Sequence, residues 1–97
     1  MKSREIMPGC HGKVVHGKKM TWVFWDIDKN ASIPKHNHPH EQIMHVVEGT
    51  FEFTFNGIKK NYGRGSIVHI PSNIYHSGKA ITKCKLMDVF SPPREEY

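Results

Sequence analysis

Apolar and polar residues alternate along several short segments of the chain, and this two-residue period is typical of half-buried β-strands. The segments are rich in aromatic and β-branched residues, which strands favour. The predicted strands are residues 20–27, 42–47, 50–55, 58–62, 66–70 and 83–90. No window keeps apolar residues at helical spacing with caps at both ends. The pattern therefore predicts an all-β protein, a sandwich or a barrel.

Two turn signals join three of these strands. Segment 42–47 meets segment 50–55 across Glu48-Gly49, and the latter meets segment 58–62 across Asn56-Gly57. Asn-Gly is the strongest short hairpin signal, because both residues adopt positive φ angles readily. The chain therefore reads as a run of hairpins, and we expect one domain that spans residues 1–97.

The length, apolar content and cysteines of the chain bear on where in the cell the protein is expected. The chain has 97 residues and is 37% hydrophobic, enough for a small core that a metal or a partner subunit would help to stabilise. No segment approaches the ~18 apolar residues of a membrane span, and no apolar run of a secretory signal follows the N-terminus. Cys10 and Cys84 have no CxxC spacing and make no disulfide framework. We therefore expect a cytoplasmic protein with free thiols.

The charge balance is basic but dispersed. The net charge is +5, from 14 Lys and Arg against 9 Asp and Glu. These residues form no basic helix and no RNA-binding aromatic motif, so we expect neither nucleic acid nor membrane as a partner. A small anionic substrate stays compatible with the surplus. Segment 20–27 is apolar on both faces, which fits either burial in its own barrel or a subunit interface, and we expect a homodimer.

The segment His-Asn-His-Pro-His-Glu-Gln at residues 36–42 holds the densest chemistry. Alternation places His36, His38, His40 and Gln42 on one face of a straight strand. Pro39 favours a bend, which leaves His36 and His38 to chelate one ion with Gln42 and turns His40 away. The parity of Glu41 points its side chain to the other face. Imidazole ligands suit divalent transition metal ions such as Ni, Zn, Mn or Fe.

A second motif lies downstream, and the two together resemble those of the cupin family. The spacing is His-x-His-x3-Gln followed by x6 and Gly49, then Gly65-x5-Pro71-x4-His76. The family motifs are G(x5)HxH(x3–4)E(x6)G and G(x5)PxG(x2)H(x3)N. The chain departs from them at Gln42, Asn73 and Ala80, and it lacks the leading glycine of the first motif. The resemblance implies a jelly-roll β-barrel, the cupin double-stranded β-helix, with a metal at His36, His38, Gln42 and His76.

The glutamine bears on the chemistry of the predicted site. A glutamate would cancel one unit of the ion's charge, whereas the neutral Gln42 leaves a divalent ion its full +2. The site also lacks the carboxylate of the two-histidine, one-carboxylate iron oxygenases. Both points favour polarisation of an oxygen on an anionic substrate over oxygen chemistry.

The last predicted strand carries a carboxylate among apolar neighbours. Leu86, Asp88 and Phe90 share one face of it. Asp88 is either an edge-strand residue that faces solvent or a general acid or base inside the barrel. Arg94, which follows two prolines, is either a surface arginine or a residue whose guanidinium binds a substrate carboxylate.

The residues HPHEQ together with DVFSPPREEY resemble the KdgF-like, uronate-linearising cupins of pectin degradation. This resemblance implies opening of 4,5-unsaturated monouronates to 5-keto-4-deoxyuronate. It implies a metal on His36, His38, Gln42 and His76, and catalytic roles for Asp88, Phe90 and Arg94. The alternatives are another cupin enzyme, such as a metal dioxygenase or a sugar isomerase, and a non-catalytic module that binds a small ligand.

Overall fold

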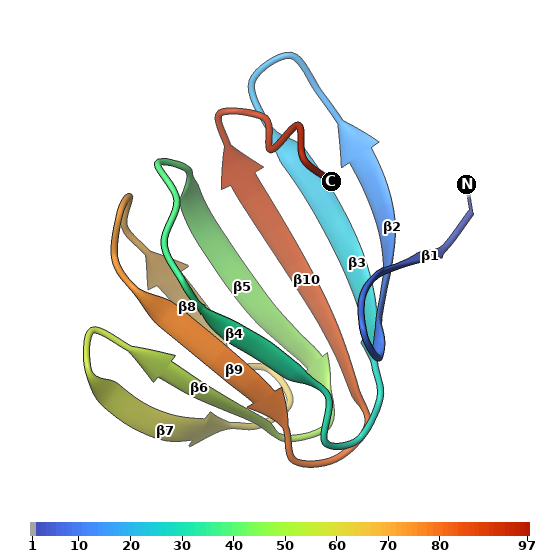
Figure 1. Cartoon of the computed structure of the whole chain (residues 1–97), viewed down its shortest axis with the longest axis vertical. Helices are drawn as coiled ribbons and strands as arrows, with labels where there is room; N and C mark the ends of the chain where they lie inside the picture. The colour runs from blue at the N-terminus through green and yellow to red at the C-terminus, as the bar shows by residue number, and fades with distance from the viewer. Residues whose placement is uncertain (1) are drawn as a thin grey trace.

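The structure, a computed structural model, describes residues 2–97 and contains ten β-strands and no helix in that range (Figure 1). The strands are β1 (Arg4–Met7), β2 (Cys10–His16), β3 (Thr21–Ile27), β4 (Ser32–His36), β5 (Glu41–Glu48), β6 (Phe51–Phe55), β7 (Ile58–Tyr62), β8 (Ile67–Ile70), β9 (His76–Ala80) and β10 (Cys84–Ser91). The all-β prediction is therefore confirmed. Over the described residues, no helix is long and apolar enough to cross a membrane.

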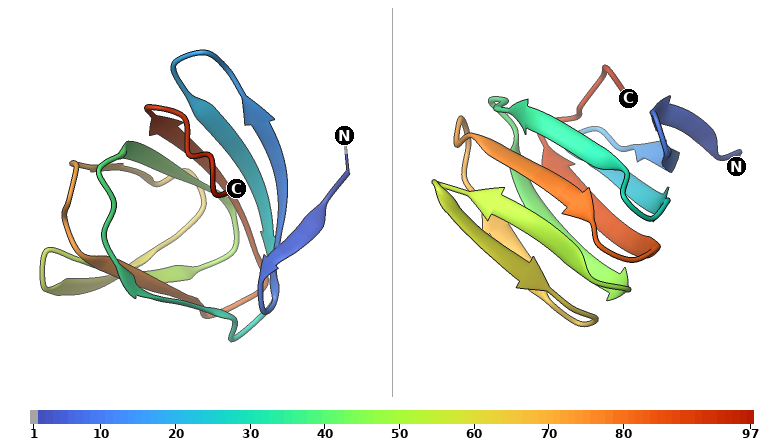
Figure 2. Two further views of the ribbon diagram at one scale, coloured as in Figure 1. Left: turned by 45° about the horizontal axis from the view of Figure 1, so that its top comes forward. Right: turned by 60° about the horizontal axis from the view of Figure 1, so that its bottom comes forward.

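Two antiparallel sheets form the barrel. The larger has the order β1-β2-β3-β10-β5-β8, and the smaller has the order β4-β9-β6-β7. They face each other as the two walls of a jelly roll (Figure 2). All six predicted strands are present with ends within one residue, as β3, β5, β6, β7, β8 and β10. The alternation pattern missed β1, β2, β4 and β9, and among these Pro34 in β4 and Gly78 in β9 weaken the strand signal.

The predicted pairing across Glu48-Gly49 is wrong, because β5 and β6 lie in different sheets. Gly49 has a φ of 90° and carries the chain round the corner between them. A Cβ at this position would lie 2.3 Å from the carbonyl oxygen of Lys83. The Asn56-Gly57 hairpin is confirmed, with φ angles of 50° and 79° between the paired strands β6 and β7.

Gly49→Ala is expected to lower the free energy of unfolding by about 3 kcal/mol or more, because a strained φ adds to a backbone collision. Gly57→Ala is the matched control, since Gly57 also has positive φ but has no atom within 4 Å of a built Cβ. It should lose only about 1–2 kcal/mol from backbone strain. Urea denaturation of both variants measures the difference, and equal losses would show that the corner tolerates a side chain.

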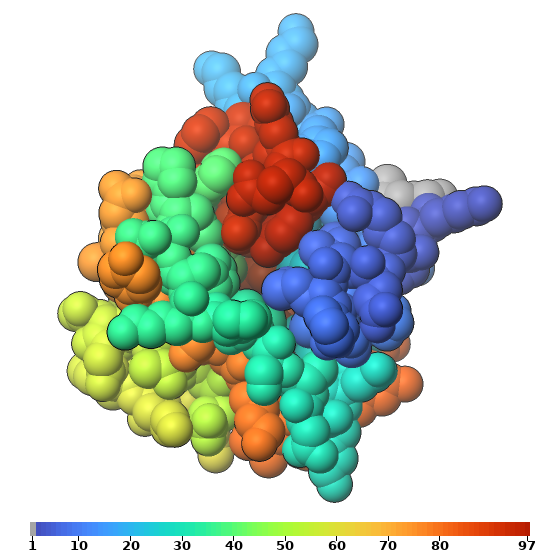
Figure 3. All heavy atoms as spheres, viewed as in Figure 1, coloured from blue at the N-terminus to red at the C-terminus, as the bar shows by residue number. Residues whose placement is uncertain are grey.

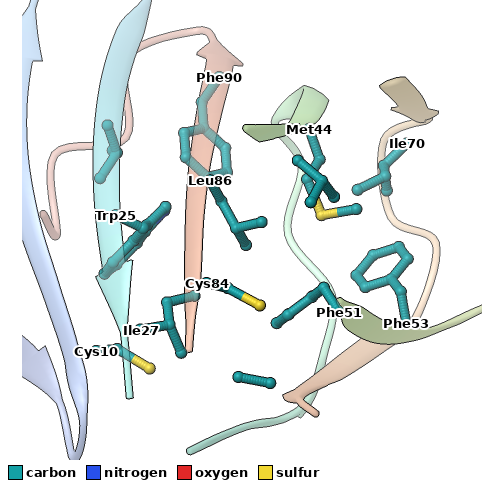
Figure 4. Packing of buried hydrophobic residues seen from close by; sticks show 13 residues of the cluster. Cys10, Trp25, Ile27, Met44, Phe51, Phe53, Ile70, Cys84, Leu86 and Phe90 are labelled. Carbon is teal, nitrogen blue, oxygen red and sulfur yellow. The ribbon is translucent and has the colours of Figure 1, made fainter. Parts of the chain in front are cut away.

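The core lies between the sheets, where alternate residues of the central strands β3, β5 and β10 point inward (Figure 4). Val23, Trp25 and Ile27 of β3 are buried. Cys10 and Cys84 both pair with Ile27, from the two strands that flank β3. Strands two places apart are about 9–10 Å from each other, beyond the reach of a disulfide. Both cysteines are free, as the sequence predicted.

The outer face of the larger sheet exposes large apolar side chains among polar ones. Trp22 and Phe24 of β3 are each 40% exposed there, and Ile43 and Val47 of β5 are exposed on the other side of β10. A groove of about 500 Å³ crosses this face. Segment 20–27 thus packs one face into its own barrel and presents the other to solvent. Large exposed apolar patches mark interaction surfaces, so the expected homodimer stays a prediction, with this face as its contact.

Light scattering on the purified protein is expected to give twice the 11.2 kDa of one chain. Phe24→Glu should give the monomer mass, because a carboxylate buried in an apolar contact is unfavourable. Ile58→Glu, at a position 68% exposed on β7 of the other sheet, should leave the mass unchanged. A monomer mass for the unaltered protein would contradict the prediction.

Candidate metal centre and its surroundings

Three histidines converge at one end of the barrel. His36 ends β4, His76 begins β9 as its cross-strand partner, and His38 lies in the loop that leads to β5. One ring nitrogen of each lies within 4.8 Å of the others. The ring centroids of His36 and His76 are 4.3 Å apart, and those of His38 and His76 are 4.9 Å apart. These residues are able to hold one metal ion.

Backbone carbonyls fix the orientation of all three rings. Each Nδ1–H donates to a carbonyl two residues away: His36 to Pro34 at 2.7 Å, His76 to Ile74 at 2.8 Å and His38 to His40 at 3.0 Å. The neutral tautomer then leaves a lone pair on Nε2, as a metal ligand requires. Burial lowers the pKa of His76 to about 4 and also lowers the pKa of His38. Both rings are therefore neutral at neutral pH.

Gln42 is the fourth predicted ligand, and its amide orientation is set by Asp88. The Nε2 of Gln42 donates to Oδ1 of Asp88 at 2.9 Å. Its Oε1 consequently faces Nε2 of His38 at 3.2 Å. Both of these atoms present lone pairs, an arrangement that is repulsive unless a cation lies near them. This donor set of three imidazoles and one amide oxygen fits a divalent transition metal.

The carboxyl group of Asp88 lies inside the barrel, next to this donor set. β10 is a central strand, so the edge-strand alternative is wrong and the general acid or base alternative remains. Trp25 donates its Nε1–H to Oδ2 of Asp88 at 2.9 Å. Burial raises the pKa of Asp88 to about 6, against the opposing effects of its hydrogen bonds with Gln42 and Trp25 and of the charge on Arg94. The group can therefore both accept and release a proton near neutral pH.

The segment after β10 closes the barrel above these groups. The Arg94 guanidinium lies 4.9 Å from the centre of the Phe90 ring and 4.2 Å from that of Tyr97. Its backbone N–H donates to the hydroxyl of Thr21 at 2.8 Å. Arg94 is buried, so the surface-arginine alternative is wrong. In the space-filling view the C-terminal segment fits between residues near 40 and the N-terminal strands (Figure 3).

The other two polar residues of the 36–42 segment lie outside the cluster. Glu41 points outward and pairs with His69 at 2.6 Å, as its parity predicted. His40 is not among the clustered rings, yet it is buried beneath the C-terminal segment. Its Nε2–H donates to the carbonyl oxygen of Pro93 at 3.2 Å. His40 therefore anchors the backbone immediately before Arg94.

Trp25, His40 and Tyr97 also lie next to the site, although no sequence pattern assigned them to it. The parity of Trp25, shared with the apolar Val23 and Ile27, was the available signal for its inward direction. Tyr97 stacks edge-on against Trp25 at 5.5 Å, a contact between chain positions that no local pattern connects.

Comparison with known proteins adds the family. The family described as "Cupin domain" matches residues 23–90. The structure of KdgF from Halomonas sp. is similar, with 28% identity, a TM-score of 0.92, and coverage of 99% of this chain and 90% of that one. An RmlC-like cupin from Shewanella frigidimarina shares 29% identity over 98% of this chain and 86% of that one, with a TM-score of 0.93.

More distant structures are similar in fold alone. A salicylate 1,2-dioxygenase from Pseudaminobacter salicylatoxidans has 19% identity and a TM-score of 0.81, over 89% of this chain and 27% of that one. No curated protein matches the sequence. The motif spacing, the jelly-roll barrel and the family match over most of the chain agree, and this protein belongs to the cupin family.

Proposed function

We propose that the protein is a metal-dependent enzyme that opens the ring of 4,5-unsaturated monouronates to 5-keto-4-deoxyuronate. The observation that carries this proposal is the hydrogen bond between Gln42 and the buried Asp88 beside the three-histidine cluster. This bond joins Asp88, a group able to transfer protons, to a set of uncharged metal ligands. The 28% identity with KdgF over 99% of the chain supports the same substrate class.

His36, His38, His76 and the Oε1 of Gln42 would hold the ion. A divalent cation bound there supplies positive charge beside an oxygen of the substrate that becomes negative during ring opening. All four ligands are neutral, so the chain itself does not reduce that charge. The Nδ1–H bonds hold the three rings in orientations that leave Nε2 free for an ion.

The reaction is an isomerisation, so atoms and electrons balance without a co-reactant. The anomeric hydroxyl loses its proton, its oxygen forms the double bond of the C1 aldehyde, and the C1–O5 bond breaks with its electron pair moving to O5. The resulting enolate becomes the 5-ketone when C4 gains a proton. We assign both proton transfers to Asp88, because its raised pKa, about 6, allows it to accept and to release a proton.

The substrate is a small sugar acid, and Arg94 is the group we assign to its carboxylate. A guanidinium fork binds a carboxylate with two parallel hydrogen bonds. Phe90, whose ring lies 4.9 Å from that guanidinium, shapes the pocket wall. The two free thiols fit a reducing compartment, so we propose that this activity is cytoplasmic.

The test is direct mixing of the metal-loaded protein with unsaturated galacturonate freshly released by a pectate lyase. The ultraviolet absorbance of the conjugated double bond is expected to fall faster than the spontaneous rate, and a chelator should remove the acceleration. Oxygen concentration, followed in the same sample, should stay constant. Oxygen consumption would favour the dioxygenase alternative, and unchanged absorbance with any of the candidate metals would contradict ring opening.

A further inference from the structure

Arg94 already has a carboxylate partner within its own segment. Its Nε–H donates to Oε1 of Glu96 at 2.6 Å. This contact lowers the pKa of Glu96, so its side chain is ionised at neutral pH. Nε–H is one of the two donors that a carboxylate uses in the side-on, two-bond geometry with arginine. The internal pair therefore takes the place that an acidic ligand would occupy most favourably.

The two partners differ in how firmly they are held. The Arg94 side chain is 10% exposed and lies between two aromatic rings, whereas the Glu96 side chain is 55% exposed. The backbone before Glu96 is fixed by Thr21 and His40, through bonds to Arg94 and Pro93. Glu96 can consequently leave the guanidinium without exposing buried apolar surface, while Arg94 stays where it is.

The spaces on the two sides of the Arg94–Glu96 pair bear on whether a ligand carboxylate can replace that of Glu96. Inside the barrel the cavity has a volume of about 20 Å³, room for one or two waters (about 10–15 Å³ each). Outside, a depression of about 290 Å³ is lined by His36, Arg94, Glu96 and Tyr97, among others. The outer space is close to the ~300 Å³ of small-ligand sites, and the inner space is far below it. His36, Arg94 and Tyr97 line both spaces, so the carboxylate of a sugar acid that enters from outside meets Arg94 on the side on which Glu96 lies.

We infer that Glu96 is a specificity-determining residue, whose carboxylate occupies Arg94 in the resting protein and is displaced by the carboxylate of the incoming ligand. This inference rests on the proposed function, because that function supplies a carboxylate ligand for Arg94. A neutral sugar offers the guanidinium only uncharged hydroxyl acceptors in place of the Glu96 carboxylate, so the internal pair selects for acids. The same pair reduces the affinity for those acids, since they must compete with it.

Binding of sodium galacturonate, a saturated monouronate, to the metal-loaded protein tests the inference by calorimetry. Glu96→Gln keeps the shape and removes the charge, and should lower the Kd for galacturonate by roughly three- to fivefold, the strength of a partly exposed ion pair. Glu95→Gln, at an exposed neighbouring position without an assigned role, is the matched control and should leave Kd unchanged. The Arg94 Nε–H resonance of unliganded Glu96→Gln, which lacks the internal carboxylate, should differ from that of the unaltered protein, and on addition of galacturonate it should move to the position that the unaltered protein shows with galacturonate bound.

Results that would contradict the role of Glu96 can be distinguished from results on ring opening. Weaker or unchanged galacturonate binding by Glu96→Gln, or binding by neither protein, overturns the inference. An equal gain in affinity for the neutral sugar galactose overturns it as well, because the effect would then be access and not charge. Ring opening is measured separately, by absorbance of the unsaturated substrate, so failure of the inference leaves that result standing.

Discussion

Replacing His38 with alanine is expected to reduce bound metal from about one equivalent to near zero. One ring nitrogen of each of His36, His38 and His76 lies within 4.8 Å of the others, and His38 faces the amide oxygen of Gln42. Its loss removes one imidazole and leaves Gln42 without its closest neighbour in the set. Elemental analysis of the purified variant measures the metal directly, and ring opening should fall to the spontaneous rate.

Thermal unfolding gives a second measure that does not depend on activity. A ligand at about 100 times its Kd stabilises the folded state by about 2.7 kcal/mol, so a chelator should lower the Tm of the unaltered protein by roughly 10 °C or more. The chelator should leave the Tm of His38→Ala unchanged. His45→Ala, on the outer face of β5, is the control and should behave like the unaltered protein. A full metal content in His38→Ala would show that the three-histidine cluster is not the site.

The parts of this architecture that follow from local periodicity could be predicted. The last strand alternates so regularly that the shared face of Leu86, Asp88 and Phe90 followed from the sequence, whereas only the structure shows that this face points into the barrel. Asn56-Gly57 fixed a hairpin because only positive φ angles close that turn. Positive φ at Asn73 likewise agrees with its position where the family motif has glycine.

Features that depend on the meeting of distant segments could not be derived from periodicity. Gly49 looked like a hairpin turn, because the local signal does not say in which sheet the next strand will pair. The contact between Arg94 and Glu96 joins neighbours in sequence, yet its importance depends on the aromatic rings of Phe90 and Tyr97 around it. The hydrogen bond from Trp25 to Asp88 spans 63 positions and required the whole barrel.

Asp88→Asn is expected to lower the rate of ring opening by about 10²- to 10⁴-fold, the usual contribution of a positioned acid or base. The amide cannot take up the proton of the anomeric hydroxyl. It also changes the hydrogen bonds, because Asp88 accepts from both Trp25 and Gln42 and an asparagine has only one accepting oxygen. The amide nitrogen would then meet either the indole N–H or the Nε2 of Gln42.

The second of these two orientations of the asparagine amide affects metal binding. If the asparagine amino group faces Gln42, the Gln42 amide turns so that its oxygen accepts, and its nitrogen then faces the cluster in place of a ligand oxygen. Metal affinity should fall by about 10- to 100-fold, as for other residues that orient a ligand. The rate must therefore be measured at metal concentrations that restore full occupancy. Asp26→Asn, on the outer face of β3, should keep both affinity and rate. Full ring-opening activity of Asp88→Asn at full occupancy would contradict the proton-transfer role, and the Gln42–Asp88 bond would then serve metal binding alone.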